Sequence, residues 1–117
     1  MPRLLGAQAA GVAPMTERLH GDHSTGSNDA ADGIQIVDPV ESERILTAID
    51  KTDGDVIAVS EAELETELQQ LHRRGFYTEP TCAVAPAVDR RFREQGRIDD
   101  GDAVGILLTG SGFKSNA

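Results

Sequence analysis

The sequence is short of aromatic residues, and it holds a single cysteine. Its 117 residues include three phenylalanines, one tyrosine and no tryptophan. The core must therefore consist mainly of Leu, Ile, Val and Ala, which suits an α/β protein better than an aromatic-rich β-sandwich. The one cysteine, Cys82, has no partner for an internal disulfide, and this favours a reducing, cytoplasmic location.

Basic residues and long apolar runs are scarce as well. Twenty Asp and Glu stand against eleven Lys and Arg, which gives a net charge of −9. That balance argues against nucleic acids and anionic membranes as partners, because both attract clustered positive charge. No apolar run approaches the ~18 residues of a membrane span, and the short apolar opening of the chain is no signal peptide. The acidity is typical either of an ordinary soluble protein or of adaptation to high salt, which screens repulsion between carboxylates.

Apolar and helical patterns alternate along a chain long enough for one domain. Strand-length apolar runs occur at 3–8, 34–36, 55–60 and 103–108, and helical spacing occurs at 9–20, 40–51, 61–74 and 81–94. Ser60 and Glu63 form the S-x-x-E capping box that begins a helix. Pro86 would cost roughly 3 kcal/mol inside a helix, so the last helix is predicted to begin at Thr81 or Cys82. The alternation predicts an α/β fold whose mainly parallel sheet has helices on both faces.

The stretch between residues 21 and 33 is small and polar, and it has no periodicity. Such a composition predicts a surface loop that is flexible or disordered. His20 and His23 flank Asp22 at its start, but the cluster lacks a convincing third ligand, so no metal site is predicted. We therefore expect one domain over residues 1–117 with a flexible loop at 21–33.

The segment TGSG at 109–112 follows the last predicted strand. Ligands of parallel sheets bind beyond the carboxyl ends of the strands, so this is a candidate site. A dinucleotide fingerprint needs a third glycine and a helix, which do not follow, and a P-loop needs a glycine where Phe113 precedes Lys114. Two interpretations remain. The segment is a plain turn, or its glycines let a flat ligand approach the backbone while the Thr109 hydroxyl forms a hydrogen bond with it.

Four stretches of the chain carry further motifs. They are PRLLGAQAAGVAP at 2–14, GDVIAVSEAEL at 54–64, GFYTEPTCA at 75–83 and LLTGSGFK at 107–114. In this order they resemble the C-terminal part of threonine synthase, a family of fold-type-II pyridoxal-phosphate enzymes. The resemblance covers nearly the whole chain apart from the loop at 21–33. It implies pyridoxal 5'-phosphate as cofactor and, in the complete enzyme, conversion of O-phosphohomoserine and water into threonine and phosphate.

The resemblance also implies roles for individual residues. The Thr109 hydroxyl would form a hydrogen bond with the pyridine nitrogen of the cofactor, beside Gly110. A neutral hydroxyl there leaves the ring a weaker electron sink than a carboxylate would. Glu79 matches a position that lines the cofactor pocket, although its place near a helix N-terminus explains a carboxylate equally well. Cys82 has no histidine near it in sequence and is predicted to be a small buried side chain rather than a nucleophile.

Two parts of the family's chemistry have no counterpart in this sequence. Neither Lys51 nor Lys114 stands in the Phe-Lys-Asp context of the lysine that binds the cofactor covalently. The glycine-rich loop for the cofactor phosphate is missing too. Lys114 matches a motif lysine with a structural or ion-pairing role, while Ser115 replaces an acidic residue common there. The resemblance therefore implies a C-terminal fragment of threonine synthase that has no activity of its own.

Three alternatives stay open. The chain is a non-catalytic remnant, or it is a subunit that docks onto a separately encoded N-terminal polypeptide. In the third alternative it is part of another fold-type-II pyridoxal-phosphate enzyme, such as a dehydratase or a sulfur-amino-acid synthase. Those enzymes more often carry Ser-Gly-Gly at the last strand, so the TGSG segment at 109–112 favours threonine synthase.

Overall fold

The computed structural model describes residues 2–21 and 26–114 of the chain. Within these residues the strands and α-helices are β1 (Leu5–Ala9), α1 (Pro14–His20), α2 (Ser42–Lys51), β2 (Asp55–Val59), α3 (Glu61–Arg73) and α4 (Val84–Glu94). The 3₁₀ turns are η1 (Asp32–Ile34), η2 (Pro80–Ala83) and η3 (Gly112–Lys114). None of the described helices has the length and apolar character needed to cross a membrane.

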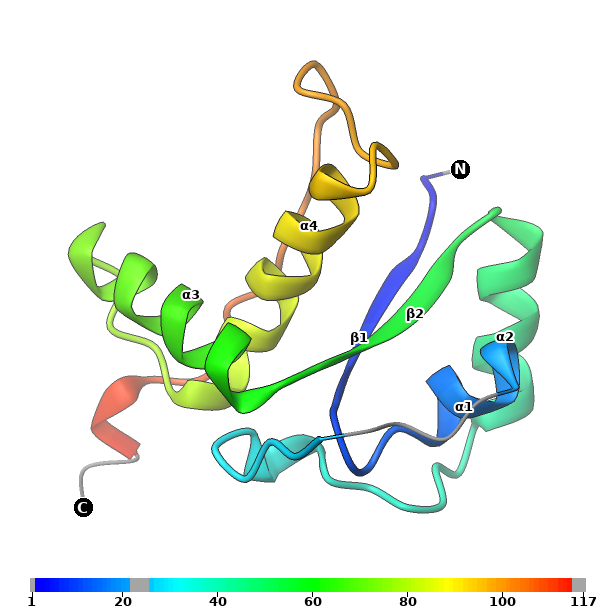
Figure 1. The fold of residues 1–117 in the computed structure, drawn as a ribbon, viewed down its shortest axis with the longest axis horizontal. Coiled ribbons are helices and arrows are strands. Elements are labelled where there is room, and N and C mark those ends of the chain that lie inside the picture. Colours follow the sequence, from blue (N-terminus) through cyan, green and yellow to red (C-terminus); the bar gives the residue numbers. More distant parts are fainter. Residues whose placement is uncertain (1, 22–25, 115–117) are drawn as a thin grey trace.

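The sheet separates two layers of helices. Strands β1 and β2 pair in parallel, with Leu5 opposite Asp55. Helices α3 and α4 lie on one side of this pair and α1 and α2 on the other (Figure 1). Side chains of β2 pack alternately against the two layers of helices. Val59 joins the core under α3 and α4, while Val56 packs with Met15 of α1. The predicted fold class, a parallel α/β sheet with helices on both faces, is confirmed.

The larger core lies under α3 and α4. Phe92 of α4, Leu64 of α3 and Val59 of β2 are among its largest fully buried side chains. The buried positions of α4 recur every three or four residues, as one face of a helix requires: Val84, Ala87, Val88 and Phe92. Burial of this stripe against both strands fixes α4 across the sheet.

Helix α3 begins where the capping box predicts. The Ser60 hydroxyl accepts a hydrogen bond from the Glu63 N–H, and the Glu63 carboxylate accepts one from the Ser60 N–H at 3.2 Å. Glu63 also pairs with Arg91 of α4, and Glu67 pairs with Arg90. Burial raises the pKa of Glu63, but hydrogen bonds from Arg91 and from the Ser60 backbone outweigh it, so the pKa lies below its ordinary value. The Glu63–Arg91 and Glu67–Arg90 pairs therefore join α3 to α4.

Two predictions in the first third of the chain are wrong. The first helix begins at Pro14 rather than Ala9, because β1 continues through Ala9 and the chain then turns at Gly11, whose φ is 91°. Residues 34–36 form no strand. The chain turns through η1 instead and leaves Ile36 55% exposed, so an apolar run here signals only that Ile34 packs on the core.

The predicted start of the last helix is also displaced. Thr81 and Cys82 belong to the 3₁₀ turn η2, and α4 begins at Val84. Pro86 then stands in the first turn of α4. The first N–H groups of a helix have no partner within the helix, so the N–H that proline lacks costs α4 no hydrogen bond at this position. For this reason Pro86 indicates a nearby helix start.

The last predicted strand, residues 103–108, joins no sheet within the described residues. The segment runs along α4 toward the C-terminal end (Figure 1). Its side chains are exposed, and Leu107 is 86% accessible. The apolar run is as predicted, but a strand also needs a neighbouring strand with free hydrogen-bonding groups, and none of residues 2–21 and 26–114 pairs with this segment as a strand.

The described part of the 21–33 stretch is tied to the end of β2. Asn28 is 1% exposed, and its side-chain amide donates to the Val59 carbonyl at 2.9 Å while its oxygen accepts from the Ala31 N–H. Residues 22–25, with His23 and Asp22, lie outside the described residues. The flexibility of the loop stays a prediction. Within residues 2–21 and 26–114, no group of His, Cys, Asp and Glu side chains is arranged to hold a metal ion.

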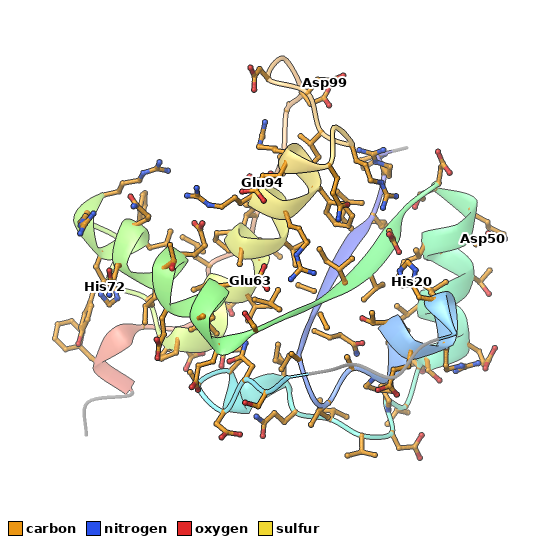
Figure 2. All side chains as sticks on the ribbon, in the orientation of Figure 1. His20, Asp50, Glu63, His72, Glu94 and Asp99 are labelled. Atoms are coloured by element: carbon orange, nitrogen blue, oxygen red, sulfur yellow. The ribbon has the colours of Figure 1, made fainter. Side chains whose placement is uncertain are left out.

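Asp55, His20 and Arg97 meet at the start of β2. The Asp55 carboxylate, 10% exposed, accepts hydrogen bonds from Arg97 Nη1 at 2.5 Å and from the Val56 N–H at 2.8 Å. His20 Nε2 lies 2.7 Å from the same carboxylate (Figure 2). Burial raises the pKa of Asp55, but the hydrogen bonds and the nearby His20 lower it more, so the pKa lies below the ordinary 3.8. The junction ties α1 and the segment after α4 to the sheet.

Asp55→Asn should weaken this junction in a pH-dependent way. We expect the substitution to lower the free energy of unfolding by roughly 2 kcal/mol at pH 7, because it removes a charge-assisted hydrogen bond. The folded-state pKa is below 3.8, so the stabilisation by Asp55 is present above that pH and is lost as the pH falls through the folded-state value. Urea unfolding of both proteins from pH 7 to pH 3 should show the difference narrowing. Asp50→Asn, at an exposed position, should change little, and a constant difference for Asp55→Asn would contradict the assignment.

Candidate functional site

The two C-terminal sequence motifs lie side by side in the fold. The Glu79 N–H donates to the Gly110 carbonyl at 3.1 Å, and the Gly112 N–H donates to the Tyr77 carbonyl at 2.9 Å. Between them, Thr78 and Ser111 form an antiparallel bridge. The FYTEPTCA and TGSG segments therefore form one structural unit, and the unit brings Thr109, Gly110 and Glu79 together.

Cys82 holds the TGSG segment from the other side. The Gly110 N–H donates to the Cys82 Sγ at 3.1 Å, and the thiol lies 3.6 Å from the Gly110 carbonyl oxygen and 3.9 Å from the Thr109 hydroxyl. Cys82 is 7% exposed, in agreement with the prediction that it is buried. Sequence reasoning assigned Cys82 to packing alone and missed these contacts.

The glycines of the segment leave room for neighbouring side chains, and their backbone angles do not call for glycine. A Cβ on Gly110 would lie 2.0 Å from Glu79 Oε1, and a Cβ on Gly112 would lie 2.7 Å from Cε1 of Tyr77. Neither glycine has a positive φ. The close approach places the Glu79 carboxylate directly against the Gly110 backbone, next to Thr109.

A cleft of about 1020 Å³ runs along this side of the molecule. It is bounded by the start of the chain and β1, by α4, and by residues 102–107. Thr81, Cys82 and Thr109 lie along its lining at the end toward which the strands point. The side chain of Thr109 is exposed. The candidate residues therefore stand at the carboxyl edge of the sheet, where ligands of parallel sheets bind.

Aromatic side chains cover the outer end of the same unit. The Tyr77 ring lies 5.0 Å from the ring of His72 and 5.0 Å from that of Phe113, measured between centroids. His72, at the end of α3 (Figure 2), has its Nε2 3.3 Å from the Thr78 carbonyl oxygen, which fits an N–H donor at that nitrogen. These contacts hold the chain on both sides of the Thr78–Ser111 bridge.

The residues present fit one edge of a flat heteroaromatic ring. Thr109 offers a hydroxyl that can donate or accept a hydrogen bond, and Gly110 presents backbone without a side chain. No lysine is among Thr109, Gly110, Glu79 and Cys82, and Lys51 belongs to α2 on the opposite layer of the fold (Figure 1). The structural role predicted for Lys114 stays a prediction, and Ser115 lies outside the described residues.

Comparisons with known proteins point to the same chemistry. A family model described as "Pyridoxal-phosphate dependent enzyme" matches residues 1–110. The threonine synthase of Methanocaldococcus jannaschii is 29% identical over 121 residues, covering 97% of this chain and 30% of the relative. Threonine synthases of Synechocystis sp. (30% identical) and Mycobacterium tuberculosis (29% identical) each match over 115 residues, again 97% of this chain, and 29% and 31% of those relatives. The chain thus spans about 30% of the length of the relatives it matches. The resemblance predicted from the motifs is confirmed.

Proposed function

The chain belongs to the pyridoxal-phosphate dependent enzymes, and from that membership we propose that it forms one wall of the cofactor pocket of a threonine synthase. The observation that carries the proposal is the position of Thr109 in the lining of the cleft, with Gly110 held next to it by Glu79 and Cys82. When bound, pyridoxal phosphate supplies an electron-withdrawing ring that stabilises negative charge on a substrate carbon. This chain would contact one edge of that ring.

Each residue of the wall has its own part in the proposal. The Thr109 hydroxyl donates a hydrogen bond to the ring nitrogen and, being neutral, does not hold that nitrogen protonated as a carboxylate would. Gly110 has no side chain, and this leaves room for the Glu79 carboxylate beside Thr109. Glu79 fixes the loop by donating its backbone N–H to the Gly110 carbonyl, 3.1 Å away. All three act by orientation, and none of them transfers a proton to the substrate.

The reaction of the complete enzyme is proposed from the relatives. Proteins named threonine synthase match 97% of this chain, and that name supports conversion of O-phosphohomoserine and water into threonine and phosphate. It also favours this reaction over those of a dehydratase or a sulfur-amino-acid synthase. We infer that the chain alone is inactive, because neither Lys51 nor Lys114 stands in the Phe-Lys-Asp context and the glycine-rich phosphate loop has no counterpart in the sequence. The cytoplasmic location and the adaptation to high salt stay predictions.

Thr109→Val tests the proposed contact. The protein for this test is a chimera in which this chain replaces the matching region of the Methanocaldococcus jannaschii threonine synthase. Valine keeps the shape of threonine and removes the hydroxyl, so we expect kcat/KM to fall roughly 10–100-fold, as the loss of a buried hydrogen bond of about 1.4–2.7 kcal/mol predicts. The absorption spectrum of the bound cofactor should shift as well, and Thr109→Ser should restore both.

The matched control is Thr66→Val at an exposed position of α3, which should leave rate and spectrum unchanged. A Thr109→Val chimera with the parent spectrum and rate would show that the hydroxyl does not contact the ring. This chain by itself, rather than the chimera, is the reference for the inferred inactivity. It should form no threonine from O-phosphohomoserine, and treatment with pyridoxal phosphate and borohydride should leave no specific adduct. A fixed adduct on Lys51 or Lys114 would contradict the inferred inactivity.

A further inference from the structure

We propose that the cleft beside β1 receives a β-strand from the part of the family's fold that this chain does not cover. The strand would insert between β1 and residues 103–108 and run parallel to both. This inference rests on the proposed function, since it assumes that the chain acts as one part of a larger enzyme. It identifies the surface and the kind of segment that complete it.

One wall of the cleft is the free edge of the sheet. Within the described residues β1 pairs only with β2, so its other edge faces the cleft without a neighbouring strand. Leu4, Leu5 and Ala7 line the cleft along this edge. Helix α4 covers one face of β1 but leaves the edge open. An unpaired edge of a parallel sheet offers backbone donors and acceptors to an added strand.

The opposite wall is an apolar segment that pairs with no strand in the described part of the chain. Residues 103–107 line the cleft, and Val104 and Leu107 are 42% and 86% exposed. The segment runs in the same general direction as β1 and β2 (Figure 1). A strand-length apolar run beside a parallel edge, yet exposed, fits a strand whose neighbour is missing.

The extent of the cleft favours a strand over a small molecule. Its lining reaches from Arg3 and Asp99, at the edge where the strands begin, to Thr109, at the edge where they end. Its volume of about 1020 Å³ is at the upper limit of the roughly 300–1,000 Å³ of small-ligand sites. A cofactor at Thr109 would fill only one end, whereas a strand would fill the whole length between β1 and the 103–108 segment.

Two observations point to the rest of the family's fold as the source of that strand. The chain matches its relatives over 97% of its own length but covers only 30% of theirs, so most of the family's fold comes from elsewhere. A second copy of this chain is disfavoured by charge, since each copy carries a net charge of −9 and the two would repel. Parallel insertion would also bring the carboxyl end of the new strand beside Thr109 and Cys82, so the residues after it would reach the candidate site.

The experiment uses this chain and, as a second polypeptide, the part of the Methanocaldococcus jannaschii threonine synthase outside the matching region, co-expressed without added cofactor. We expect a one-to-one complex in which amide hydrogen exchange slows in β1 and in residues 103–108. Val104→Asp should weaken the complex at least tenfold, because it places a charge in the apolar cleft. Leu107→Asp should act in the same direction. Both positions are exposed in the isolated chain, so its circular dichroism should not change.

Val40→Asp is the matched control, because Val40 is 98% exposed and is not among the cleft residues. Its complex should be as tight as that of the parent chain. The proposal is overturned if no complex forms, if Val104→Asp and Leu107→Asp bind normally, or if the protected amides lie elsewhere. It is also overturned if the chain dimerises through the cleft or if pyridoxal phosphate alone gives the same protection. Binding is measured without cofactor, so a complex that forms while Thr109→Val has no effect contradicts only the proposed function.

Discussion

Phe92→Ala is expected to lower the free energy of unfolding by about 3–5 kcal/mol, the usual cost of truncating a fully buried phenylalanine. Phe92 is 0% exposed and lies in the core formed by α3, α4 and the sheet, together with Leu64 and Val59. The guanidinium of Arg97 also stands 4.8 Å from the centre of its ring. Small domains have only about 5–15 kcal/mol of stability in total. Urea unfolding followed by circular dichroism should therefore show a large fall in the midpoint or loss of the folded state.

Phe113→Ala is the matched control for this substitution. Phe113 is 78% exposed and its main ring contact is the edge-to-face pair with Tyr77, so its removal should cost no more than about 1 kcal/mol. Similar losses for the two alanine variants would mean that the core does not lie under α4 as described. The comparison matters for function because α4 forms one wall of the cleft, so a loosened α4 would also disturb the candidate site.

Features determined by neighbouring residues were predictable from the sequence. Helix α3 begins at Glu61 after the Ser60–Glu63 capping box, because both partners of that motif lie within one turn of each other. The alternation of apolar strands with amphipathic helices likewise gave the parallel α/β class, since each pattern reflects how a single element is buried. The predicted helix starts were wrong where a turn precedes the helix. Helix α1 begins at Pro14, after the turn at Gly11, and α4 begins at Val84, after the 3₁₀ turn η2.

Strand pairing was not predictable in the same way. Residues 55–59 and 103–108 are both apolar and of strand length, yet among the described residues only the first segment pairs with a strand. The difference lies in the surroundings, because β2 meets β1 whereas the later segment faces a cleft. An apolar run reports that burial is favourable, and it carries no information on whether the partner strand is part of the same chain.

The candidate site likewise has one part that sequence motifs predicted and another part that they did not. Thr109, Gly110 and Glu79 could be named in advance because motifs resembling those of threonine synthase marked them, and the structure brings them together. The contact of Cys82 with Gly110 joins residues 28 positions apart in the chain, and no local pattern encodes such a contact. A signal was nonetheless present, since Cys82 stands within the FYTEPTCA motif that packs on TGSG.

Gly54→Ala is expected to be as damaging as the loss of a core side chain. Its φ is not positive, so backbone freedom is not the reason for glycine. A Cβ here would lie 1.8 Å from the Leu4 carbonyl oxygen and 3.3 Å from that of Ile49. Both are backbone atoms that cannot rotate away. Relief would require the chain before β1 to move from the start of β2, where the Asp55 N–H donates to the same Leu4 carbonyl.

We expect this clash to cost about 3 kcal/mol, the upper end of the ~1–3 kcal/mol usual for overpacking, with amide exchange accelerating in both strands. Gly101→Ala supplies the control, because a Cβ at Gly101 has no atom within 4 Å and should change the stability by less than about 1 kcal/mol. Equal unfolding midpoints for the two alanine variants would mean that β1 does not approach Gly54 as closely as described. A selective effect at Gly54 would instead show that the start of the sheet, and with it the open edge along the cleft, is fixed by a backbone contact that tolerates no side chain.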